Sequence, residues 1–160
     1  MSNKHISESG NLHMIDVSDK KITTRVATAS GTIILNDEAF SSVVELNNKK
    51  GDVLNTARIA GINAAKQTSN LIPLAHNISL NSVDIDFQFN NKTNEIISIA
   101  QVKSEGKTGV EIEAMIAVQI SLMTIYDMCK YLDRAMEINK IRLLSKTGGK
   151  SGTFDRGDSV

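Results

Sequence analysis

The chain has 160 residues, with 18 basic and 18 acidic side chains that give a formal net charge of zero at pH 7. This length favours a single domain with a core of its own, and the balanced charge gives no general attraction to nucleic acid or to an acidic membrane. The single cysteine, Cys129, excludes an internal disulfide framework and a cysteine-rich metal site.

The first 20 residues are polar and are predicted to form an irregular N-terminal segment. They lack the apolar stretch of a signal peptide, and no apolar run in the chain is expected to span a membrane. A soluble, cytoplasmic protein is therefore expected. One catalytic domain is predicted over residues 21–154, followed by a flexible tail over residues 155–160.

The domain is predicted to begin with a strand and a short helix. Residues 22–35 are rich in β-branched side chains, which favours a strand, and Gly31 is expected to break it. Residues 36–47 predict a short helix that is capped by Asn36 or Asp37.

A second helix is predicted over residues 51–72, with Asp52 near its start and Pro73 at its end. Its small side chains recur at the spacing of one helix face, and such a face allows another backbone to approach closely. The small residues are Ala57, Ala60, Gly61, Ala64 and Ala65.

Apolar and polar side chains then alternate over residues 82–89, which is typical of a half-buried strand. The polar segment at residues 90–94 predicts a turn, and residues 95–105 predict the partner strand. The two strands are expected to form an antiparallel hairpin.

A long helix is predicted over residues 110–136, and a last strand over residues 138–144. The middle of this helix is apolar on nearly every side, so we expect it to be buried on more than one face. The order β-α-α-β-β-α-β predicts an α+β, ferredoxin-like fold, an antiparallel sheet with helices packed on one face.

The segment "LLSKTGGKSGTF" at residues 143–154 suggests a phosphate site but is not a P-loop. That motif requires a glycine where Leu144 stands, and it must be followed by a helix, for which the remaining polar residues are unsuited. Lys146, Lys150 and the accessible N–H groups of the glycines could still bind phosphate. The alternative is a flexible basic tail.

The long helix carries a charged pair, Asp127 and Lys130, three positions apart on one helix face. A charged pair within an apolar helix is costly unless it is paired or functional. A simple ion pair at the helix edge is the alternative, since Asp133 and Arg134 follow. Cys129, between the two charges, is expected to be a core thiol.

Other polar residues stand at the edges of the predicted elements, where functional sites tend to form. Lys49 and Lys50 precede a helix, and His76 lies in a loop after a proline. Thr108 and Glu111 have the spacing of a helix cap. Each of these is explained singly by a solvated loop or a cap.

Several motifs together resemble the molybdenum cofactor biosynthesis protein C (MoaC) family, the cyclic pyranopterin monophosphate synthases. They are "HMIDVSDK", "KGDVLNTARIAGINAAKQTSNLIPLAH", "GKTGVEIEAM", "MTIYDMCK" and "RLLSKTGGKSG". The resemblance runs from His13 to Phe154, in the same order and at the same spacing.

The resemblance implies a ferredoxin-like α+β fold and a homohexamer, built as a trimer of dimers with active sites between subunits. It implies a lyase that converts 3',8-cyclo-7,8-dihydro-GTP into cyclic pyranopterin monophosphate and releases pyrophosphate. This chemistry requires proton transfers but no electron transfer, so neither a cofactor nor a metal is expected. Lysines with pKa values brought near neutral by neighbouring cations, and a buried carboxylate, would move the protons.

Carried onto matching positions, the resemblance implies that Asp127, Lys130 and Lys50 are catalytic. It also implies that five residues line the substrate: Leu74, Ala75, His76, Ile112 and Glu113. As contacts of the triphosphate it suggests Arg25, Lys146 and Lys150.

The chain departs from the family at two places. The family usually has Leu-Cys-His-Pro where this chain has "LAHN", and often has histidine at Lys49. The alanine at position 75 indicates that a thiol there is not required. The alternative function is a non-catalytic ligand-binding or assembly subunit. Five retained residues argue against it: Lys50, His76, Glu113, Asp127 and Lys130.

The positions of Glu113 and Asp127 bear on the expected assembly. They lie fourteen residues apart, which on one straight helix is roughly 21 Å. We therefore expect each site to take Glu113 from one subunit and Asp127 from another, with the long helices antiparallel near a two-fold axis.

Overall fold

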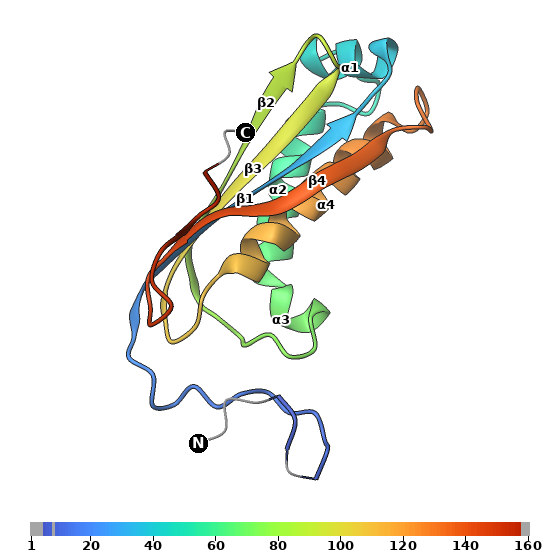
Figure 1. Ribbon diagram of the computed structural model, residues 1–160. Coiled ribbons are helices and arrows are strands. Elements are labelled where there is room, and N and C mark those ends of the chain that lie inside the picture. Colours follow the sequence, from blue (N-terminus) through green and yellow to red (C-terminus); the bar gives the residue numbers. More distant parts are fainter. Residues whose placement is uncertain (1–4, 8, 158–160) are drawn as a thin grey trace.

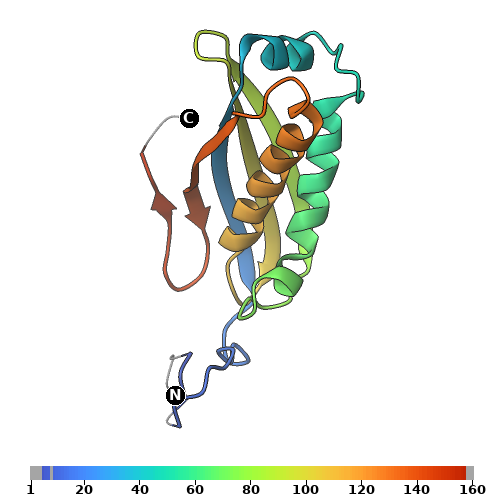
Figure 2. The same cartoon turned by 90° about the vertical axis from the view of Figure 1, so that its right-hand side faces the viewer.

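Figure 1 shows the computed structural model, in which residues 5–7 and 9–157 are described. The ends of the predicted N-terminal segment and C-terminal tail, at residues 1–4 and 158–160, lie outside the described residues. The remaining part of the N-terminal segment has irregular backbone and extends away from the sheet (Figures 1 and 2).

Within the described residues, one antiparallel sheet has the strand order β2-β3-β1-β4-β5. The first four strands match the predicted ferredoxin-like pattern. The short fifth strand was not predicted, because the segment before it looked like a polar tail. The strands are β1 (Thr23–Ile34), β2 (Leu80–Asn90), β3 (Glu95–Gly106), β4 (Glu137–Thr147) and β5 (Phe154–Asp155).

The helices α2 (Val53–Lys66) and α4 (Glu111–Cys129) lie side by side on one face of the sheet (Figure 2). The α+β fold predicted from the sequence is therefore confirmed. α1 (Asp37–Val44) follows β1 and is capped by Asn36, whose side chain accepts from the Ala39 N–H at 2.8 Å.

The predicted helix over residues 51–72 is divided into α2 and a single turn, α3 (Thr68–Leu71). Gln67 separates them with a φ of −101° and donates its N–H to the carbonyl of Ala64, three residues back. The Thr68 hydroxyl donates to the Ala65 carbonyl at 2.9 Å. These bonds replace the regular helical pattern at the junction.

The prediction that the long helix runs to Met136 is wrong, because α4 ends at Cys129. The Cys129 carbonyl accepts from the N–H groups of both Leu132 and Asp133, which closes a turn instead of another helical repeat. The Asp133 carboxylate then accepts from the Asn36 N–H at 2.8 Å and ties this turn to the end of β1.

Gly31 does not break β1, which runs through it, but the pairing of β1 with β4 shifts register there. A Cβ atom on Gly31 would lie within 2.8–3.0 Å of side-chain atoms of Val118, Leu122 and Ile141. The glycine therefore lets α4 approach the middle of the sheet, which explains why a residue unfavourable in strands occurs here.

By length and composition alone, α4 is apolar enough to cross a membrane, contrary to the sequence expectation. Just over half of that span is buried inside the domain, where α4 packs against the sheet and, on its side, against α2. Leu122 and Ile125 are both fully buried. The helix is thus a core element that is covered on more than one face, as predicted from the apolar residues on nearly all sides of its middle part.

The small-residue face of α2 contacts α4, so the close approach of another backbone that the sequence predicted occurs within the domain. Ala57 and Gly61 are buried there. A Cβ atom on Gly61 would overlap the Ser121 hydroxyl and lie 2.5 Å from Ile85 Cδ1 and 2.8 Å from the Ala117 carbonyl oxygen. The small side chains of α2 therefore allow the backbone of α4 to pack closely against it.

Replacing Gly61 with alanine is expected to destabilise the fold. The added methyl group must push α4 away, which costs about 1–3 kcal/mol and exceeds the gain of about 0.5–1 kcal/mol in helix propensity. Asn63→Ala, an exposed substitution on the same helix, is the control and should leave stability nearly unchanged. Urea unfolding of both variants measures the difference, and an unchanged midpoint for Gly61→Ala would contradict the close-packing explanation.

Candidate active site

The site residues predicted from the sequence lie at opposite ends of α4 (Figure 1). At its N-terminal end, one cavity is lined by all five predicted substrate-lining residues, and we call it the histidine pocket. At its C-terminal end, Lys50, Asp127 and Lys130 form a group that we call the lysine cluster. The residues of the histidine pocket that were predicted are Leu74, Ala75, His76, Ile112 and Glu113.

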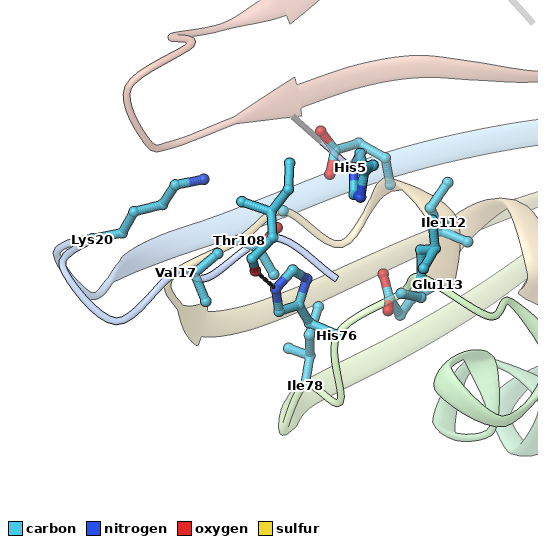
Figure 3. A pocket seen from close by; sticks show the side chains of 13 residues that line it. His5, Val17, Lys20, His76, Ile78, Thr108, Ile112 and Glu113 are labelled. Atoms are coloured by element: carbon cyan, nitrogen blue, oxygen red, sulfur yellow. Dashed lines mark hydrogen bonds between the residues drawn. The ribbon is translucent and has the colours of Figure 1, made fainter. Parts of the chain in front are cut away.

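The histidine pocket has a volume of about 370 Å³ and is formed by three segments of the chain (Figure 3). The N-terminal segment contributes residues such as Val17 and Lys20, the loop before β2 contributes His76, and the start of α4 contributes Glu113. The N-terminal segment is tied in place by Lys107, whose ammonium donates to the Ser18 carbonyl at 2.6 Å.

His76 is held by a contact with the N-terminal segment. Its Nε2 lies 2.8 Å from the carbonyl oxygen of Ile15, which is the dashed line in Figure 3. A carbonyl oxygen only accepts, so Nε2 carries a hydrogen and donates it. This bond orients the imidazole within the pocket.

Glu113 is the buried carboxyl group of the pocket, with 4% of its surface exposed. Burial disfavours its charged form and raises its pKa to about 7, and the negative charge of Glu111 acts in the same direction. A hydrogen bond from the backbone N–H of Glu113 to its own carboxylate partly offsets this increase in pKa. A carboxyl group of this kind can both hold and release a proton near neutral pH.

The predicted cap of α4 by Thr108 and Glu111 is wrong, because the helix starts after Val110 with no side-chain cap. The Glu111 carboxylate instead pairs with the Lys146 ammonium at 2.7 Å, and both side chains are partly buried. A Cβ atom on Gly109 would overlap this carboxylate, so the glycine leaves room for the pair.

Arg25 lies beneath the glycine turn that follows β4. Its side chain donates to the carbonyls of Gly106 at 3.4 Å and Lys107 at 3.5 Å, and it is only 8% exposed. A Cβ atom on Gly149 would overlap the guanidinium. Arg25 thus joins the loop before α4 to the turn that carries Lys150, which is itself exposed.

The lysine cluster lies at the exposed end of α4, not inside the apolar part of the helix. The Asp127 carboxylate is 2.6 Å from the Lys130 ammonium and 3.7 Å from that of Lys50. Lys50 also donates to the Asp127 carbonyl oxygen at 2.7 Å. Asp127 lies two residues before the end of the helix, and 59% of its side chain is exposed to solvent.

The sequence led us to expect lysines with pKa values near neutral, but the pKa of Lys130 is shifted in the opposite direction. The hydrogen bond and charge of Lys130, with the charge of Lys50, lower the pKa of Asp127. The same hydrogen bond and the negative charge of Asp127 raise the pKa of Lys130. Asp127 therefore keeps Lys130 charged, and the carboxyl group whose burial brings its pKa near neutral is Glu113.

Sequence reasoning missed two residues that contact the predicted ones. Tyr131 accepts a hydrogen bond from the Lys49 N–H at 3.2 Å, and the Lys49 ammonium lies 3.6 Å from the centre of its ring. Glu111 was interpreted only as a cap. No local pattern could have predicted the first contact, because Lys49 and Tyr131 are 82 residues apart in the chain.

Cys129 is fully buried, as expected for a core thiol, and burial raises its pKa to about 11. The thiol therefore stays protonated and is a poor nucleophile. Among residues 5–7 and 9–157, no group of three or more His, Cys, Asp or Glu side chains is arranged to hold a metal ion.

Comparison with known proteins agrees with the resemblance seen in the motifs. Residues 14–149 match the MoaC family. The chain is 50% identical over 153 residues to the cyclic pyranopterin monophosphate synthase of Staphylococcus carnosus (strain TM300), with 95% of each chain covered. It is 51% identical over 156 residues to that of Clostridium botulinum (strain Alaska E43 / Type E3), with 96% of this chain and 98% of the relative covered.

A similar synthase from Peptoclostridium acidaminophilum is 47% identical over 152 residues, which cover 95% of this chain and 96% of the relative. The matches extend over nearly all of both chains, so they include the strands, the helices and both ends of α4. The chain therefore belongs to the MoaC family.

Proposed function

We propose that this chain is a cyclic pyranopterin monophosphate synthase, a lyase that converts 3',8-cyclo-7,8-dihydro-GTP into cyclic pyranopterin monophosphate and pyrophosphate in molybdenum cofactor biosynthesis. The observation that carries the proposal is the lysine cluster, in which the ammonium groups of Lys50 and Lys130 both lie within 4 Å of the Asp127 carboxylate. A non-catalytic subunit would have no need to retain both this group and the histidine pocket at the other end of α4. The enzyme acts in the cytoplasm on a small-molecule substrate.

The proposed active site is shared between two subunits. Glu113 and Asp127 lie fourteen positions apart on one helix, hence roughly 21 Å apart. A single substrate would barely span that separation within one chain. An antiparallel neighbour would place its lysine cluster beside the histidine pocket, within a homohexamer built as a trimer of dimers.

Exposed apolar side chains on α4 support a contact of this kind. Met123 is 55% exposed and Ile112 is 43% exposed. Their spacing puts both on the same side of the helix as Asp127. An apolar stripe between the two ends of the helix would be covered by a second copy of α4.

The reaction opens the purine ring, rearranges it to a pterin and closes a cyclic phosphate. In the last step a substrate hydroxyl oxygen bonds to the α-phosphorus, and the bond from that phosphorus to the bridging oxygen of pyrophosphate breaks. Glu113 has the pKa of a group that exchanges protons near neutral pH. Lys130, whose pKa is raised by Asp127, stays charged and is suited to donating hydrogen bonds to negative charge that develops on the substrate. Leu74, Ala75, His76 and Ile112 would position the ring system.

The triphosphate would be bound near the glycine turn after β4. Lys146 is held there by Glu111, Lys150 is exposed on the turn, and Arg25 braces the turn from below. Phosphate oxygens are strong acceptors for ammonium groups and accessible backbone N–H groups. The segment would thus bind phosphate without the helix that a P-loop requires.

Asp127→Asn and Lys130→Ala are expected each to reduce turnover by at least about 100-fold, because loss of one positioned donor to developing charge costs about 10²–10³-fold and Asp127 holds that donor in place. Since both side chains are exposed, folding and assembly should persist. Product formation and gel filtration measure the two properties. Near-normal turnover in both variants would remove the cluster from the mechanism.

Lys146→Ala combined with Lys150→Ala is expected to weaken substrate binding about tenfold or more, because hydrogen bonds to charged groups contribute about 1.5–3 kcal/mol. The loss should be larger for the triphosphate substrate than for the matching nucleoside. Lys92→Ala, in the exposed β2–β3 turn, is the control. Equal losses for both ligands would indicate a role in folding and not in phosphate binding.

Complementation tests the shared site. Inactive Glu113→Ala and Asp127→Asn proteins, mixed under conditions that exchange subunits, should form dimers with one intact site and regain part of the activity. Each variant incubated alone under the same conditions is the control. If mass spectrometry verifies mixed dimers that remain inactive, and each single variant is folded, the two-subunit geometry is incorrect.

A further inference from the structure

We propose that Asn48 is a positioning residue, which fixes the turn before α2 so that Lys50, and not the adjacent Lys49, faces Asp127. The inference rests on the proposed catalytic role of Lys50. It adds an uncharged residue from the connection between α1 and α2, which bonds to the backbone of Lys50 and not to the ionic groups of the lysine cluster.

Asn48 is 6% exposed and shapes the turn with both of its oxygen atoms. Its side-chain Oδ1 accepts from the Lys50 N–H at 2.9 Å. Its main-chain oxygen accepts from the Gly51 N–H at 2.9 Å, and Gly51 has a φ of +95°. These two bonds define the backbone on either side of Lys50, as an asparagine side chain does in a turn.

The amide nitrogen of Asn48 anchors this turn to two helices. It donates to the Ser42 hydroxyl of α1 at 3.2 Å and lies 3.6 Å from the Cys129 sulfur of α4. The Ser42 hydroxyl already donates to the Ala39 carbonyl at 2.8 Å, so only its lone pairs face Asn48. The amide therefore has one satisfactory orientation, with its oxygen toward Lys50.

The anchor on α4 lies within the segment that carries the lysine cluster. Cys129 is two residues after Asp127 and directly precedes Lys130. The Asp127 carbonyl is among the last of the helix, where carbonyls lack helical partners, and it accepts from the Lys50 ammonium at 2.7 Å. Asn48 thus links the backbone of Lys50 to the same helix end that its side chain must reach.

The two neighbouring lysines point to different partners. The Lys49 ammonium lies over the Tyr131 ring, and its N–H donates to the Tyr131 hydroxyl, whereas Lys50 reaches Asp127. Lysine side chains are long and lose considerable rotamer freedom when they are fixed. A turn free to change its backbone would let both lysines compete for Asp127, and the contacts of Asn48 prevent this.

The main test compares Asn48→Ala with Asn47→Ala. Asn47 is the adjacent, exposed asparagine, whose amide donates to Glu45 at 3.1 Å. Misplacing a catalytic group by about 1 Å can cost about 100-fold in rate. We therefore expect Asn48→Ala to lower kcat by about 10- to 100-fold with little change in KM, and Asn47→Ala to leave both constants unchanged. Asn48→Ser, which keeps a turn-forming oxygen, should recover part of the loss.

A second readout does not depend on turnover. The relative rates at which a small acylating reagent modifies Lys49 and Lys50 are measured by mass spectrometry of the free enzyme. Asn48→Ala should raise the modification of Lys50 relative to Lys49, because Lys50 leaves Asp127, and Asn47→Ala should not. If Asn48→Ala fails to fold, Ser42→Ala removes the support of the amide nitrogen and should shift the same ratio.

A Lys50→Gln background separates this inference from the proposed active site. Because Asn48 acts through Lys50, adding Asn48→Ala there should lower kcat no further. Folded Asn48→Ala protein with normal kcat and an unchanged labelling ratio would overturn the inference, as would an equal rate loss in both backgrounds. Normal turnover of Lys50→Gln alone would instead overturn the catalytic role of Lys50, and the labelling ratio would then decide whether Asn48 positions it.

Discussion

The close packing of α4 against both the sheet and α2 is the constraint on which both parts of the site depend. Gly31 allows the helix to approach the sheet, and Gly61 allows it to approach α2. Because protein interiors are close-packed, a helix held from two sides cannot shift without opening cavities or overlaps. Its two ends are therefore fixed in space, and they carry the histidine pocket and the lysine cluster.

Two carboxyl groups on this helix have opposite electrostatic environments. Glu113, buried and near Glu111, has its pKa raised to about 7, whereas the pKa of exposed Asp127 is lowered by Lys130 and Lys50. Groups whose surroundings push their pKa values apart are suited to different roles in acid–base chemistry. Glu113 is suited to proton exchange, and Asp127 to holding cations in place.

The lysine cluster contributes little to stability, because exposed ion pairs are typically worth less than about 1 kcal/mol. Its order depends on uncharged contacts around it. Asn48 supports the turn that bears Lys50, and Tyr131 holds Lys49 away from Asp127. Functional groups need neighbours that hold them in a defined position, and Asn48 and Tyr131 are such neighbours for the two lysines.

The sequence by itself determined the hairpin, the small-residue face of α2, the core position of α4 and the family, because each depends on periodicity or on motifs that are local in the chain. Only the tertiary structure decided where α4 ends, since the turn after Cys129 depends on Asp133 meeting Asn36, nearly a hundred residues away. The same is true of the pairing of Glu111 with Lys146 and of the exposure of Asp127. Contacts between segments that are distant in the chain determine how far a side chain is buried and which charges surround it. No local sequence pattern encodes such contacts.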